Sequence, residues 1–185
     1  MDAAGFQVYP VKNFADWLRI RILYRFSFPR SERKPFSIIC RMHKQGKTDI
    51  LCIAHEGRFC GFASTINGNE GTLLDYLAVR RKLRGKGAGS ALLAHMLARY
   101  ENTGLFVEIE NAFVECANSD ERIRRRNFYI RNGMQPLNVF AEVFGVNMEI
   151  LGCGINISFE QYREFYRTNY SDFAAKHILP VKQPN

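Results

Sequence analysis

The chain has 185 residues, of which 46% are hydrophobic and 24% charged, and its formal net charge is +8. This length and balance predict a single domain with a sizeable core and argue against a disordered chain. No apolar run reaches the length of a membrane span, and the first residues lack the basic-then-apolar pattern of a signal peptide, so we expect a cytoplasmic protein.

The basic charge leaves several classes of anionic partner open, whereas the cysteines and histidines argue against disulfides and metal sites. A net positive charge attracts nucleic acid, anionic lipid and phosphorylated cofactors alike. The five cysteines are odd in number and form no Cys-x-x-Cys pair, and the four histidines show no metal-ligand spacing. We therefore expect buried free thiols and no metal site.

The first half of the chain is predicted to begin with a strand and two helices, which three strands follow. Asn13 is placed to cap the first helix, with Asp16 in its first turn. Turns at Glu56-Gly57 and at Asn67-Gly68-Asn69 separate the three strands. The expected elements are a strand over 6–11, helices over 14–26 and 36–44, strands over 49–55 and 59–66, and a strand ending at Val79.

Strands and helices then alternate through the second half. The helix after residue 87 carries one core-facing stripe at three- and four-residue spacing, made of Leu92, Leu93, Met96, Leu97 and Tyr100. The other expected elements are a strand over 105–110, a helix over 121–132 capped by Ser119, strands over 134–140 and 146–151, a helix over about 159–170, and a polar tail. The summed pattern predicts an α/β (α+β) fold with one mixed sheet and helices on both faces.

The most informative stretch joins an apolar strand to a helix through a basic, glycine-rich turn. Residues 73–79 are apolar except for Asp75 and Tyr76, residues 80–86 are mostly basic, and Gly85, Gly87 and Gly89 alternate before the helix. Backbone N–H groups at a helix start that no side chain crowds form an anion site. The spacing fits neither the dinucleotide fingerprint nor the P-loop. The stretch therefore predicts a pyrophosphate site, with an ordinary flexible turn as the alternative.

Two motifs resemble those of the GNAT-type N-acyltransferases, which use acetyl-CoA. Arg84-x-x-Gly87-x-Gly89 matches the family's Arg/Gln-x-x-Gly-x-Gly/Ala signature, and residues 128–134 look like its Φ-Tyr-x-x-x-Gly-Φ element, where Φ is apolar. The resemblance implies one domain over 1–185 with a mostly antiparallel sheet of six to seven strands and a C-terminal helical extension from about residue 155. It implies acetyl-CoA as co-substrate, bound by Leu77, Ala78, Val79, Arg84, Gly85, Lys86, Gly87, Ala88, Gly89 and Ser90.

The helix that carries the second motif departs from the family pattern at two positions. Arg122 stands where many members have an Asn that contacts the cofactor, and Arg125 stands where an Ala is common. These arginines reach a phosphate of the cofactor or face water.

The resemblance also implies Tyr129 as general acid for the leaving thiolate. The pKa of a phenol is close enough to that of a thiol for the proton transfer to cost little free energy. The alternative is that Tyr129 is only a core residue of its helix. Asp75 and Tyr76 are further candidates for the catalytic site.

Glu108 and Glu110 are the candidate bases for the acceptor amine. Strand alternation places both carboxylates on one face, roughly 7 Å apart. The alternative is a solvated or salt-bridged pair that meets Arg124 or Arg126.

The leading hypothesis is transfer of an acetyl group from acetyl-CoA to a primary amine of a small-molecule or peptide acceptor, by direct attack in a ternary complex. A nucleic-acid-binding protein is the alternative that the charge and the basic run 122–126 suggest. A non-catalytic acyl-CoA-binding module is the third reading. Under the leading hypothesis no nucleic-acid or membrane partner is expected, and a homodimer through the helix from Phe159 onward stays open.

Overall fold

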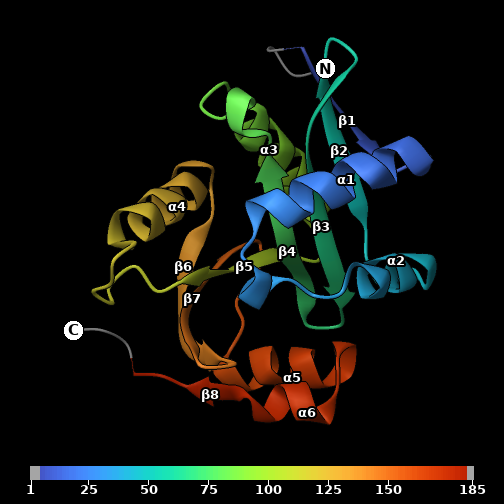
Figure 1. Ribbon diagram of the computed structural model, residues 1–185. Helices are drawn as coiled ribbons and strands as arrows, with labels where there is room; N and C mark the ends of the chain where they lie inside the picture. Colours follow the sequence, from blue (N-terminus) through green and yellow to red (C-terminus); the bar gives the residue numbers. More distant parts are fainter. Residues whose placement is uncertain (1–4, 183–185) are drawn as a thin grey trace. The chain divides into compact units, whose positions relative to one another are not determined.

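The computed structural model describes residues 5–182 (Figure 1). Its eight strands form one sheet in the order β1-β2-β3-β4-β5-β7-β6-β8. Strands β4 and β5 pair in parallel, and the pairings of β1 with β2, β2 with β3, β5 with β7, β6 with β7 and β6 with β8 are antiparallel. The predicted mixed, mostly antiparallel sheet is confirmed, and it has one strand more than the six to seven expected.

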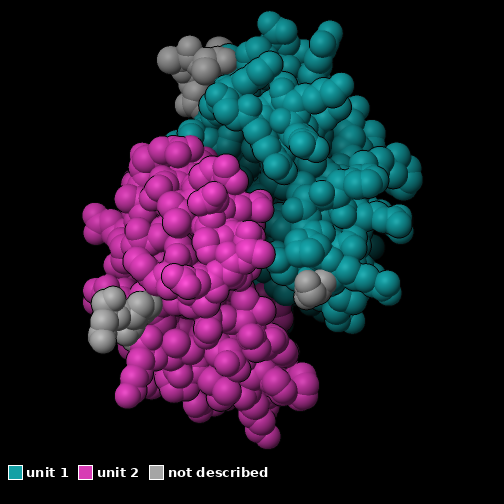
Figure 2. Space-filling model, turned by 60° about the vertical axis from the view of Figure 1, so that its left-hand side comes forward, with its two compact units in different colours: residues 1–67, 74–99 teal, residues 68–73, 100–185 magenta. Residues whose placement is uncertain are grey.

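The chain divides into two compact units (Figure 2), unit 1 with residues 1–67 and 74–99 and unit 2 with residues 68–73 and 100–185. Unit 1 contains β1 (Phe6–Pro10), α1 (Phe14–Ser27), a 3₁₀ turn (Arg30–Glu32), α2 (Phe36–Lys44), β2 (Ile50–His55), most of β3 (Arg58–Gly68) and of β4 (Gly71–Val79), a second 3₁₀ turn (Arg81–Leu83), and α3 (Ala88–Arg99).

Local signals explain where the elements of unit 1 begin and pack. The Asn13 side chain accepts a hydrogen bond from the backbone N–H of Asp16 at 3.0 Å, so the predicted cap of α1 is confirmed. Ile20 and Tyr24 of α1 share a buried cluster with Ile39 of α2 and with residues of the sheet. At Gly61 of β3 an added Cβ would lie only 2.3 Å from the carbonyl oxygen of Ala78, so this glycine allows a close approach to β4.

Unit 2 contains β5 (Leu105–Glu110), α4 (Ser119–Arg131), β6 (Gln135–Val143), β7 (Val146–Cys153), α5 (Phe159–Asn169), α6 (Asp172–Lys176) and β8 (Ile178–Pro180). The first residues of β4 also belong to it, and there Thr72 and Leu73 pair with Leu105 and Phe106. Ser119 was expected to cap α4, but Asn118 precedes the helix and Ser119 lies inside it. The Ser119 hydroxyl instead donates to the Cys116 carbonyl oxygen at 2.8 Å.

The expectation of a polar tail after α5 is wrong. Ser171 caps the short helix α6 by accepting from the Ala174 N–H at 3.1 Å, and β8 then pairs with β6. Ile178 of β8 is completely buried. Elements of five and three residues carry too little periodicity to be recognised in a sequence.

None of the helices between residues 5 and 182 combines the length and the apolar character needed to cross a bilayer.

Candidate functional site

The glycine-rich turn lies between the end of β4 and the start of α3, in unit 1 (Figure 1). Gly85 and Gly87 have φ angles of 75° and 89°, in the left-handed region that favours glycine. The Ala91 N–H bonds to the Gly87 carbonyl oxygen at 2.9 Å, so the first helical hydrogen bond closes there. The N–H groups of the first turn of α3 have no intrahelical partner by geometry, and they give the turn the donors of an anion site.

Basic side chains surround this turn and brace it. Arg84 donates from Nε to the Val79 carbonyl oxygen at 3.3 Å, which ties the turn to the end of β4. Arg80 donates from Nη1 to the Phe59 carbonyl oxygen, also at 3.3 Å. Arg80 and Arg84 are both exposed, as are Arg81, Lys82 and Lys86. Their positive charge adds to that of the helix dipole.

The expected strand residues differ in their access to solvent. Ala78 and Val79 are buried, and Leu77 is partly exposed.

Tyr129 lies in unit 2 on the buried side of α4, with 7% of its surface exposed. Burial raises its pKa to about 12, and the nearby Arg125 charge opposes this rise. A thiol has a pKa of about 8.5, so moving the proton from this phenol to a thiolate costs roughly 5 kcal/mol. Burial thus widens the difference between the pKa of Tyr129 and that of a thiol.

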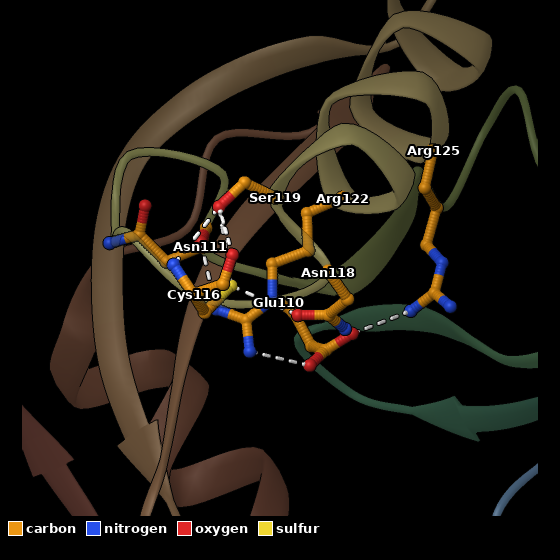
Figure 3. A network of polar contacts seen from close by, with 7 residues as sticks. All are labelled: Glu110, Asn111, Cys116, Asn118, Ser119, Arg122 and Arg125. Carbon is orange, nitrogen blue, oxygen red and sulfur yellow. Dashed lines mark hydrogen bonds and ion pairs between the residues drawn. The ribbon is translucent and has the colours of Figure 1, made fainter.

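Glu110 is held between two arginines of α4 (Figure 3). Arg122 donates from Nη2 to Glu110 Oε1 at 2.8 Å, and Arg125 donates from Nη1 to Oε2 at 3.3 Å. The alternative of a salt-bridged Glu110 is thus found, but with Arg122 and Arg125 in place of Arg124 or Arg126, because residues three apart share a helix face. Arg122 thus binds a carboxylate rather than facing a phosphate or water.

The same network continues at the start of α4 (Figure 3). Arg122 also donates from Nη1 to the Asn111 carbonyl oxygen at 3.3 Å, and the Cys116 thiol donates to Asn118 Oδ1 at 2.9 Å. These contacts fix the connection between β5 and α4.

Glu108, on the same face of β5, has partners of another kind. Its Oε1 accepts hydrogen bonds from the Tyr162 hydroxyl at 2.8 Å and the Tyr166 hydroxyl at 2.7 Å. Burial, followed by the Glu108 charge, raises the pKa of both tyrosines well above the usual value. Neither tyrosine was predicted from the sequence as a partner of Glu108. Their four-residue spacing in α5 was visible, but the partner lies more than 50 positions earlier in the chain.

Asp75 and Tyr76, the further candidates, are bound within unit 1. Lys34 Nζ lies 2.6 Å from Asp75 Oδ1. The Tyr76 hydroxyl donates to the Glu32 carbonyl oxygen at 3.0 Å and accepts from Tyr24 at 3.2 Å. Burial raises the pKa of Tyr76 far above its usual value. Both side chains hold the loop before α2 against β4.

Among residues 5–182, no group of three or more His, Cys, Asp or Glu side chains is arranged to hold a metal ion. All five cysteines are free thiols. Cys52 and Cys60 are buried as expected, and the other three are partly exposed.

Comparison with known proteins covers the middle of the chain by sequence and most of the chain by fold. Residues 47–136 match the family model of the acetyltransferase (GNAT) domain. None of the curated proteins matches this chain. Similar solved structures include a GNAT-family protein from Bacteroides thetaiotaomicron, with 18% identity over 91% of this chain and 98% of that chain and a TM-score of 0.73.

Two further structures carry more specific descriptions. The ribosomal-protein-S18-alanine N-acetyltransferase of Escherichia coli has 16% identity over 83% of this chain and 96% of its own, with a TM-score of 0.60. A Salmonella typhimurium protein solved with its cofactor acetyl-CoA has 14% identity over 80% of this chain and 93% of its own, with a TM-score of 0.58. At these identities the likeness shows the fold, and with the family model it confirms the resemblance.

Proposed function

Because this chain carries a GNAT acetyltransferase domain, we propose that it is an N-acetyltransferase that moves an acetyl group from acetyl-CoA to a primary amine by direct attack in a ternary complex. The observation that carries the proposal is the turn before α3. There, two left-handed glycines, first-turn N–H groups and five exposed basic side chains meet. A pyrophosphate is the small anion that this combination fits.

Under this proposal, Arg84 to Ser90 bind the pyrophosphate of acetyl-CoA, and the end of β4 at Leu77 to Val79 pairs with the pantetheine chain. The Salmonella protein, whose structure holds acetyl-CoA, supports the choice of cofactor through its shared fold. The acceptor is a small-molecule or peptide amine.

The proposed reaction balances in protons and bonds. The amine nitrogen attacks the thioester carbonyl carbon, the C–N bond forms, the C–S bond breaks, and the CoA thiolate leaves with the electron pair. A backbone N–H at the end of β4 stabilises the developing oxyanion. The acceptor enters as an ammonium ion, so it gives one proton to a base before attack and a second proton to the thiolate afterwards.

Tyr129 is the proposed general acid for the leaving thiolate, as the family resemblance implies. With a pKa of about 12 its phenol stays protonated at neutral pH, so its O–H is kept as a donor. The second proton reaches the thiolate from the nitrogen of the tetrahedral intermediate, directly or through Tyr129.

The nucleic-acid alternative loses one of its two supports, the basic run 122–126, while the net charge of +8 is unchanged. Arg122 and Arg125 bind Glu110, and Arg126 binds Glu149, so three arginines of the basic run are engaged inside unit 2. Charges that are satisfied in this way contribute little to binding a polyanion.

Isothermal titration of acetyl-CoA into wild type and Gly87→Glu tests the cofactor site. The added carboxylate repels the pyrophosphate, so we expect at least a tenfold loss of affinity. Gly57→Glu is the matched control, because Gly57 also has a positive φ, 71°, and its added Cβ meets nothing within 4 Å. Equal affinity in all three folded proteins would remove the turn from the cofactor site.

Absence of acetyl-CoA binding by folded wild type would refute the enzyme reading. Release of CoA with a panel of amines then separates an enzyme from a non-catalytic acyl-CoA-binding module.

A further inference from the structure

Helix α1 of unit 1 carries large apolar side chains on its exposed face as well as on its buried one. The exposed ones lie four positions apart, so they share one face and form an apolar stripe of Phe14, Leu18, Ile22 and Phe26. The buried residues of the helix, Asp16, Ile20 and Tyr24, repeat with the same spacing. Each follows a member of the stripe by two positions, which is a rotation of about 200°. The apolar stripe therefore points away from the core of unit 1.

The apolar stripe is large for a surface that stays in water. Figure 1 shows α1 lying across β2 and β3, and its buried side packs there. Phe14 and Phe26, at the two ends of the stripe, are 82% and 83% exposed. With about 200 Å² for each phenylalanine, the four side chains expose roughly 500 Å² over a length of about 18 Å. Patches of this size on monomers are often functional, so we expect a partner to cover this one.

The positive charge of the protein is concentrated in the same part of the chain. Residues 12–47, called here the basic segment, hold ten lysines and arginines and two acids, whereas the rest of the chain holds sixteen of each. The basic segment, which includes α1 and α2, thus accounts for the whole net charge of +8.

Helix α1 itself presents arginines beside the apolar stripe and no exposed acid. Arg21 and Arg25 are exposed, and each directly precedes a member of the stripe. Asp16 is the one acid in the helix, and it is buried with Arg19 Nη1 at 3.3 Å from its Oδ1. A partner of α1 therefore meets apolar rings flanked by positive charge.

A second copy of this chain fits the apolar stripe poorly. A stable interface buries about 800 Å² on each partner, which is more than the stripe offers. The copy would also bring its own basic segment, and like charges that face each other across an interface are unfavourable. An anionic bilayer fits both features, because its acyl chains accept the apolar side chains and its headgroups attract the arginines.

We propose that α1 is a docking surface for an anionic lipid bilayer. The apolar stripe enters the boundary between headgroups and acyl chains, and the basic segment contacts the lipid phosphates. This inference goes beyond the proposed acetyl transfer and does not depend on it. The expectation of no membrane partner concerned apolar runs long enough to span a bilayer, and a helix that lies on the surface needs no such run.

Unit 2 exposes another pair of phenylalanines, which provides a control. Phe144 and Phe173 are 52% and 65% exposed, and their ring centroids are 6.5 Å apart. Acids lie within two positions of each of them, Glu142 and Asp172. This pair thus resembles the apolar stripe in exposure and differs from it in charge.

The test is co-sedimentation of the full chain with vesicles of phosphatidylcholine, alone or with about 30% phosphatidylglycerol. We expect binding to the anionic vesicles and at least about tenfold weaker binding to the neutral ones. Salt screens the attraction between headgroups and arginines, so raising NaCl from about 0.1 M to about 0.5 M should weaken the binding to anionic vesicles.

Two double variants remove the two components separately. Phe14→Gln with Phe26→Gln removes the ends of the apolar stripe, and Arg21→Gln with Arg25→Gln removes two charges beside it. We expect each to weaken binding to anionic vesicles by about thirtyfold or more, the scale for two buried rings or for two arginines near an anionic surface. Because all four side chains are exposed, both variants should keep the wild-type melting temperature.

Matched double variants in unit 2 serve as controls. Phe144→Gln with Phe173→Gln removes two exposed rings, and Arg124→Gln with Arg163→Gln removes two exposed charges from helices. Binding should stay within about threefold of wild type in both, less than the change expected for one arginine near the lipid.

Trp17 reports on the contact without any substitution. It is the single tryptophan of the chain, and it lies on α1 between Phe14 and Leu18. Vesicles with brominated acyl chains should therefore quench its fluorescence. Vesicle binding without this quenching would place the contact on another surface and overturn the proposal.

Three other outcomes would overturn it as well. The first is absence of binding to anionic vesicles, and the second is equal binding by wild type and both α1 double variants. The third is a wild type that ignores vesicles but binds a DNA duplex or forms a dimer through the basic segment. Failure of the protein to bind acetyl-CoA would refute the proposed function and leave the vesicle result as it stands.

Discussion

Arg126 binds both carboxylate oxygens of Glu149, with Nε 2.8 Å from Oε2 and Nη2 3.0 Å from Oε1. Glu149 is only 1% exposed, and the same guanidinium lies 5.2 Å over the ring of Phe113. The pair joins α4 to β7 within unit 2. Its two parallel hydrogen bonds give it a geometry that a lysine could not reproduce.

Removal of Arg126 should leave a buried carboxylate without its cation. We expect Arg126→Met to lower the free energy of unfolding by about 3–5 kcal/mol, measured by urea denaturation. Arg124→Met is the control, because Arg124 is an exposed neighbour on the same helix and should cost less than about 1 kcal/mol. Equal effects of the two changes would show that the pair contributes nothing particular to stability.

A side chain at Gly61 should disrupt the contact of β3 with β4. The added Cβ of Gly61→Ala would lie 2.3 Å from the Ala78 carbonyl oxygen, and backbone cannot give way as a flexible side chain can. We expect a loss of about 3 kcal/mol or more, at the upper end for overpacking. Gly57→Ala, at a strained but open position, should cost only about 1 kcal/mol.

Equal melting temperatures for Gly61→Ala and Gly57→Ala would contradict this prediction. They would mean that β3 and β4 move apart to accommodate the added Cβ at little cost in stability. The melting temperature by circular dichroism is the readout.

The stability of the fold should decline at alkaline pH. Burial raises the pKa of Tyr129 from 10.0 to about 12, so the folded state holds that proton more tightly than the unfolded chain does. This contribution is fully present below pH 10 and is lost as the pH rises from 10 to 12.

Tyr129→Phe should flatten this decline by up to about 1.4 kcal/mol per pH unit, the value for one proton. Urea unfolding at half-unit steps from pH 9 to 11.5 gives both slopes. Parallel curves for wild type and variant would mean that Tyr129 ionises as readily in the folded state as in the unfolded chain.

The short strand β8 offers two adjacent positions with opposite environments. Ile178 is 0% exposed and Leu179 is 48% exposed. We expect Ile178→Ala to destabilise the protein by about 2–4 kcal/mol, and Leu179→Ala by less than about 1 kcal/mol. Thermal unfolding of the two variants provides the comparison, and a larger loss at Leu179 would mean that β8 is not placed as described.

Elements with strong local signals could be predicted from the sequence. The cap at Asn13 and the bounds of α2 and β5 follow from residues within a few positions of each other. The turn at Gly85 and Gly87 was found in the same way, since an apolar strand and an amphipathic helix frame it.

Features that depend on distant residues could not be predicted. Alternation placed Glu108 and Glu110 on one face of a strand, but their different partners come from α5 and α4. The burial that raises the pKa of Tyr129 could not be predicted either, because it results from packing and not from its neighbours in the chain.

The two units are interleaved along the chain, because residues 68–73 belong with 100–185 while 74–99 belong with 1–67. A single proteolytic cut therefore cannot separate the two units, and a gene fragment that ends after residue 99 would contain unit 1 together with residues 68–73 of unit 2. The chain passes from one unit to the other at three places, two at the hairpin between β3 and β4 and one after α3. Circular permutation, or splitting of this protein for complementation, would have to take all three into account.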